Sequence, residues 1–97
     1  MTGANKRAIE VVLDYIKELE SDHSWKNKKV LAQWSYSIWA AEEILGQLRE
    51  KRKEAPLWVL EDFVLKMDTY ACYSRSNSFM FSVAADTGKV IIDELLA

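Results

Sequence analysis

Apolar residues recur every three or four positions along nearly the whole chain, and this spacing limits the fold more than any other feature. Such a period places side chains on one face of an α-helix. Four runs of this kind stand between short polar segments. The 97 residues include only three glycines and one proline, too few for the many turns of a β-sandwich or barrel. The sequence therefore predicts an all-α fold.

The breaks in this pattern set the expected helix ends. Ala55-Pro56 should end the second helix, because proline disfavours helix in the residue before it and opens a new helix well. The polar turn 74–78 separates the last two runs. We predict helices at residues 4–20, from Trp25 or Lys28 to Lys53, at 56–73 and at 79–96. Connections this short join antiparallel neighbours, so we expect a four-helix up-down bundle in a single domain, residues 1–97.

Each predicted helix carries one continuous apolar stripe that should face the core. The stripes are Ile9, Val12, Ile16 and Leu19; Leu31, Trp34, Ile38, Ala41, Leu45 and Leu48; Leu57, Leu60, Val64, Met67 and Ala71; Phe81, Ala84, Gly88, Ile91 and Leu95. Of these residues we expect Trp34, Ile38, Leu60, Val64 and Ile91 to be buried. The second helix is the longest, so it either breaks, with Gly46 as one weak point, or extends past its neighbours.

The aromatic residues exceed what these stripes can hold. Within the run QWSYSIWAAEE, residues 33–43, Tyr36 and Trp39 lie away from the inner stripe of the second helix. In the third helix Trp58, Leu65 and Cys72 are seven residues apart and form a second, flanking stripe.

Two interpretations of this surplus remain open: aromatic packing at helix boundaries, or burial against a second chain. The candidate partner-binding residues are Tyr36, Trp39, Trp58 and Trp25. We expect self-association through a face that includes Trp39, with Trp58 as the next candidate, because a homodimer is the commonest oligomer.

Two basic clusters occupy opposite ends of the second helix. They are Lys26, Lys28 and Lys29, and Arg49, Lys51, Arg52 and Lys53. A nucleic-acid-binding regulator would need both clusters on one face, and this is the alternative function. The net charge of −2 argues against nucleic acid as the main partner. Attraction to the negative end of the helix dipole is enough to explain the second cluster.

The sequence offers no catalytic arrangement, metal site or cofactor site. His23 is the only histidine and Cys72 the only cysteine, so neither a zinc site nor a Cys-His pair is expected. The small residues Ala84, Ala85 and Gly88 leave room either for a ligand or for bulky neighbours from a facing helix. No polar groups converge there, so we identify no small-molecule substrate.

The same residues indicate a cellular location. No run approaches 18 uninterrupted apolar residues, so we expect no membrane span. The charged N-terminal segment differs from a secretory signal, and a lone cysteine suits the reducing cytoplasm. We therefore expect a small cytoplasmic, non-catalytic protein-interaction module that binds a protein partner, in the first instance itself.

Overall fold

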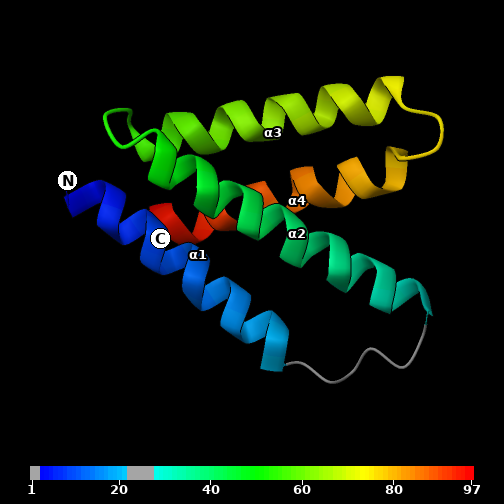
Figure 1. The fold of residues 1–97 in the computed structure, drawn as a ribbon, viewed down its shortest axis with the longest axis horizontal. Coiled ribbons are helices and arrows are strands. Elements are labelled where there is room, and N and C mark those ends of the chain that lie inside the picture. The colour runs from blue at the N-terminus through cyan, green and yellow to red at the C-terminus, as the bar shows by residue number, and fades with distance from the viewer. Residues whose placement is uncertain (1–2, 22–27) are drawn as a thin grey trace.

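A computed structural model describes residues 3–21 and 28–97 of the chain. Four α-helices and the turns between them make up these ranges, and no strand occurs within them. The helices are α1 (Gly3–Ser21), α2 (Lys28–Glu50), α3 (Pro56–Tyr73) and α4 (Ser78–Leu96) (Figure 1). The predicted all-α, four-helix bundle is confirmed, and α2 is the longest helix with 23 residues. Trp25 and Lys26 lie outside the described residues.

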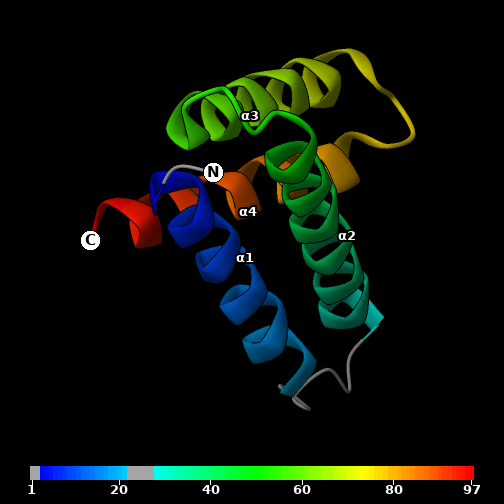
Figure 2. The same cartoon turned by 60° about the vertical axis from the view of Figure 1, so that its left-hand side comes forward.

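The helices form two pairs that cross. α3 and α4 lie side by side, and the pair formed by α1 and α2 runs obliquely across them (Figures 1 and 2). α4 contacts all three other helices and packs most extensively against α3. The start of α1, the α2–α3 turn and the end of α4 all lie at one end of the molecule (Figure 2). Residues far apart in the sequence therefore meet at that end.

The structure tests two expectations about α2, its continuity at Gly46 and its C-terminal end. The helix is continuous through Gly46, so it does not break there. It ends at Glu50 and not at Lys53, and residues 51–54 form a turn. The sequence pattern extended the helix too far because Lys and Arg are themselves good helix formers. By contrast, α3 has the predicted bounds, with Pro56 in its first turn.

The core lies where the two helix pairs cross. Its most completely buried apolar members are Ala8, Val12, Ala40, Ala41, Ile44, Leu48, Val59, Leu60, Phe63, Ala84, Ala85 and Ile91. The burial expected for Leu60 and Ile91 is thus confirmed.

The buried stripes of α2 and α3 are rotated from the predicted ones. In α2, Trp34 and Ile38 are only half-buried. In α3, Val59 and Phe63 are almost completely buried, whereas Val64 is half-buried. Both helices are apolar on more than one side, so a three-four spacing fits two rotations about the helix axis. Contact with the neighbouring helices selects between them.

Gly88 explains why α3 and α4 pack so closely. A Cβ atom at this position would lie 2.6 Å from Val64 Cγ2 and 3.4 Å from Phe63 Cδ1. The missing side chain therefore admits α3 directly against the α4 backbone. Ala84 and Ala85, one turn earlier, are also buried. At Gly88, the space that the sequence left open for a ligand is occupied by side chains of α3.

The helices end without the glycine that usually follows a helix. No described residue has a positive φ angle, so the exposed carbonyls of the last turns need other partners. α1 and α2 supply them to each other. The Asn5 amide nitrogen donates a hydrogen bond to the Leu48 carbonyl in the last turn of α2, at 3.2 Å. The Trp34 indole N–H donates to the Leu19 carbonyl in the last turn of α1.

Side-chain donors also reach carbonyls in the last turns of α2 and α3. The Arg52 Nε donates to the Arg49 carbonyl at 3.0 Å. The Ser78 hydroxyl, at the start of α4, donates to the Ala71 carbonyl in α3 at 2.9 Å. These bonds stop the helices where the chain must turn, and they hold α4 against α3 at the far end of the molecule.

Candidate interaction surfaces

The structure places two of the four candidate partner-binding residues against other parts of the chain. Tyr36 is half-buried, and its ring meets that of Phe79 of α4 edge to face, with centroids 5.9 Å apart. Trp39 is half-buried and packs against the core. Trp25 lies outside the described residues. Trp58 is therefore the candidate that remains most open to a partner.

Trp58 belongs to an exposed apolar stripe on α3. Its side chain is 51% exposed, that of Leu65 is 66% exposed, and Cys72 is also exposed. These three residues are seven positions apart, two helical turns, so they lie above one another on a single face. That face points away from the side of α3 that buries Val59 and Phe63. We call Trp58, Leu65 and Cys72 the α3 outer face.

Charged groups surround this apolar stripe. The Lys51 ammonium lies 5.8 Å from the centroid of the Trp58 ring, a cation–π contact that holds the lysine over the indole. Lys66 pairs with Asp62 one turn earlier, at 3.0 Å. The hydrogen bond and the charge of Asp62 raise the pKa of Lys66 above its usual value. Asp68 faces Lys89 of α4 at 3.8 Å.

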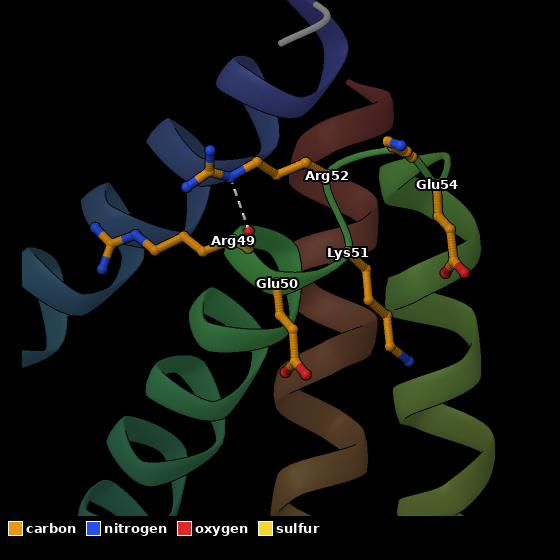
Figure 3. Close-up of a pocket in the computed structure, with 6 residues that line it drawn as sticks. Arg49, Glu50, Lys51, Arg52 and Glu54 are labelled. Atoms are coloured by element: carbon orange, nitrogen blue, oxygen red, sulfur yellow. Dashed lines mark hydrogen bonds between the residues drawn. The ribbon is translucent and has the colours of Figure 1, made fainter.

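The second basic cluster does not form a single face. In Figure 3, Arg49 and Arg52 extend toward α1, whereas Lys51 points to the opposite side, along α3. Glu50 and Glu54 stand among them. The residues 49–54 line an open hollow of about 610 Å³. Lys26 lies outside the described residues, and the side chains of Lys28 and Lys29 are not described, so the structure does not place the first cluster.

The fold adds two cations that the sequence pattern did not connect with this cluster. Lys6 and Arg7 are exposed in the first turns of α1, and the neighbouring Asn5 contacts the end of α2. Arg7 lines a further hollow of about 350 Å³, whose walls are Ala55, Pro56, Leu57, Leu95 and Leu96. Only the crossing of the helix pairs brings these segments together, so no local signal in the sequence could have shown the hollow.

Other chemistry is limited in the part of the chain that the structure describes. Among these residues no three His, Cys, Asp or Glu side chains come together as they would around a metal ion. His23 and Asp22 lie outside the described segments. Within residues 3–21 and 28–97, no helix combines the length and the apolar character that a membrane crossing requires.

No protein-family model matches the chain, and no curated protein or solved structure resembles it significantly.

Proposed function

We propose that this chain is a small non-catalytic protein-interaction module that associates with a second copy of itself through the α3 outer face. The observation that supports the proposal is the exposure of Trp58 and Leu65 on one side of α3, at 51% and 66%. Large apolar side chains gathered on one face of a small protein usually mark a site of contact with another molecule. We further propose that the module works in the cytoplasm, where the exposed Cys72 stays reduced.

A two-fold dimer suits the spacing of this face. When two α3 helices pair in antiparallel orientation about an axis at Leu65, each Leu65 contacts its own copy. Trp58 of one chain then lies near Cys72 of the other, because both are seven residues from the axis. Burying an aromatic side chain removes about 150–250 Å² from water, so the two tryptophans are the natural anchors of this contact.

Trp39 plays a different part in this proposal from the one the sequence suggests. Its side chain packs against the core, so we expect Trp39 to stabilise the folded chain rather than the contact between chains. Two substitutions should therefore have different effects. Leu65→Glu should prevent association and leave the bundle folded, because it places an uncompensated charge in the contact between chains. Trp39→Glu should lower the melting temperature, because it places a charge against the core.

The experiment is sedimentation equilibrium of the parent and the two variants at matched concentrations. Circular dichroism melts of the same samples report whether each variant is folded. We expect a concentration-dependent dimer for the parent and a stable helical monomer for Leu65→Glu. Ser35→Glu is the control, since Ser35 is also exposed but lies on α2, away from the α3 outer face. A parent that remains monomeric at high micromolar concentration would rule out the homodimer, and a Leu65→Glu dimer would move the contact elsewhere.

A further inference from the structure

We propose that the end of the bundle formed by α1, the α2–α3 turn and the end of α4 binds an acidic segment of another protein, and that the hollow beside Arg7 receives an apolar side chain of that segment. The hollow shares no residue with the α3 outer face, so the proposal does not rest on self-association, although Lys51 contacts Trp58 of that face. We call the surface the basic end and define its cations as Lys6, Arg7, Arg49, Lys51, Arg52 and Lys53.

The α2–α3 turn carries unbalanced charge. Residues 49–54 hold four of the 13 lysines and arginines of the chain and two of its 15 aspartates and glutamates, although the whole chain carries −2, and Lys6 and Arg7 add two cations. Glu94, near the end of α4, lines another hollow with Asp14 and Glu18 of α1. Cations therefore exceed carboxylates at the α2–α3 turn itself.

Among the described residues, no carboxylate neutralises these cations. Both ion pairs found among the described residues, Lys66–Asp62 and Lys89–Asp68, lie on α3 and α4. In the same part of the chain none of the six cations has a carboxylate oxygen within 4.0 Å. A negatively charged partner would be drawn to these cations and would stabilise them.

The shape and lining of the hollow favour the same kind of partner. Apart from Arg7, its walls are the apolar residues Ala55, Pro56, Leu57, Leu95 and Leu96. Its volume of about 350 Å³ is at the lower end of the range of about 300–1,000 Å³ typical of ligand pockets. Leu96 is 67% exposed, so the hollow presents unburied apolar surface directly beside a guanidinium group. A large apolar side chain next to a carboxylate matches both features.

A protein segment fits this arrangement better than nucleic acid or a bilayer. Glu50 and Glu54 stand among the cations, and Arg49 and Lys51 point to opposite sides, so no continuous row of cations faces a phosphate backbone (Figure 3). A bilayer is entered by protruding apolar side chains, whereas this apolar surface is concave. A hollow receives a protruding side chain, as in the recognition of amphipathic helices.

The probe is a fluorescein-labelled synthetic peptide of glutamate and leucine, with the leucines at helical spacing, measured by fluorescence anisotropy against the full chain. A peptide with serine in place of leucine tests the hollow, and a peptide with lysine in place of glutamate tests the charge. We expect micromolar binding of the first peptide, at least about tenfold weaker binding of the serine peptide and no binding of the lysine peptide. Affinity should fall as salt rises, because exposed charges are screened.

Two variants locate the site, and a third controls for charge alone. Arg7→Glu should weaken binding at least about tenfold, since it reverses the charge at the rim of the hollow. Leu96→Asp should weaken it by a similar factor without unfolding the protein, because this side chain is largely exposed. Arg75→Glu makes the same charge change as Arg7→Glu at the α3–α4 turn, at the opposite end of the molecule, and should have little effect.

Several results would overturn the proposal. Equal weakening by Arg75→Glu and Arg7→Glu would show only a general charge effect. Equal affinity for the glutamate–leucine and glutamate–serine peptides would remove the hollow from the site. Tighter binding to duplex DNA or to phosphatidylserine vesicles than to the peptide would assign the basic end to a different class of partner. Loss of binding in the self-association variant Leu65→Glu would show that the two surfaces are not separate.

Discussion

Two glycines in the middle of helices have opposite roles because their surroundings differ. Gly46 lies on the exposed side of α2, and a Cβ atom there would meet nothing within 4 Å. Gly88 lies in the contact between α3 and α4, where a Cβ atom would be 2.6 Å from Val64. From the sequence, Gly46 is a weak point in its helix, and Gly88 is a small residue that leaves room for a ligand or for a bulky neighbour. Gly46 lowers the stability of α2, whereas Gly88 allows Val64 to pack closely against α4. Only the position of Val64 in the structure shows this difference.

We therefore expect opposite effects from the same substitution. Gly46→Ala should raise the free energy of unfolding by about 0.5–1 kcal/mol, because alanine restricts the unfolded chain and favours helix. Gly88→Ala should lower it by about 1–3 kcal/mol, because α3 must move away from α4. Urea denaturation of both variants measures the difference, and each serves as the control for the other. A stabilising Gly88→Ala would contradict the close approach of Val64 to Gly88.

The pair α1–α2 is held at both ends by bonds from one helix to the last turn of the other. Asn5 is fully buried and donates to the Leu48 carbonyl, and Trp34 donates to the Leu19 carbonyl. The residues of the first bond are 43 positions apart, so no local pattern could have predicted it. The same bond explains why α2 ends near Glu50, although the following Lys and Arg residues favour a helix.

Removing this bond should destabilise the bundle. Asn5→Ala should lower the free energy of unfolding by about 1–3 kcal/mol, because it leaves a buried carbonyl without its donor. Asn77→Ala is the matched control: this exposed asparagine precedes α4 and makes no side-chain cap bond, so its loss should change stability by less than about 0.5 kcal/mol. Urea denaturation compares the two. Equal effects would contradict the capping role of Asn5.

On α3, the ion pair between Lys66 and Asp62 has a predictable dependence on pH. Asp62 raises the pKa of Lys66 above the usual value of 10.5, first through its hydrogen bond and then through its charge. A raised lysine pKa gives stability that is complete below the usual value and is lost as the pH rises through the raised one. NMR titration of Lys66 should show a pKa above 10.5 that falls in Asp62→Asn. An unchanged pKa in that variant would remove Asp62 as the cause.

At the scale of the whole molecule, the sequence predicted the elements better than their contacts. The bounds of α3 follow from local signals, Pro56 at one end and the polar turn 74–78 at the other. The stripe Trp58–Leu65–Cys72 was also visible as a spacing of seven, but its exposure was not, since that depends on which side of α3 meets α4. The basic end was missed because Lys6 and Arg7 join the α2–α3 turn only when the helix pairs cross.

The most direct test of self-association uses the single cysteine of the unmodified chain. Cys72 is exposed on the α3 outer face of one chain, and the proposed two-fold contact covers it with Trp58 of the other. The rate of its reaction with a maleimide reagent in excess should therefore fall as the protein concentration rises through the dimerisation range, and should be independent of concentration in Leu65→Glu. A parent that forms dimers in sedimentation but whose Cys72 reacts at one constant rate would show that the α3 outer face is not the contact.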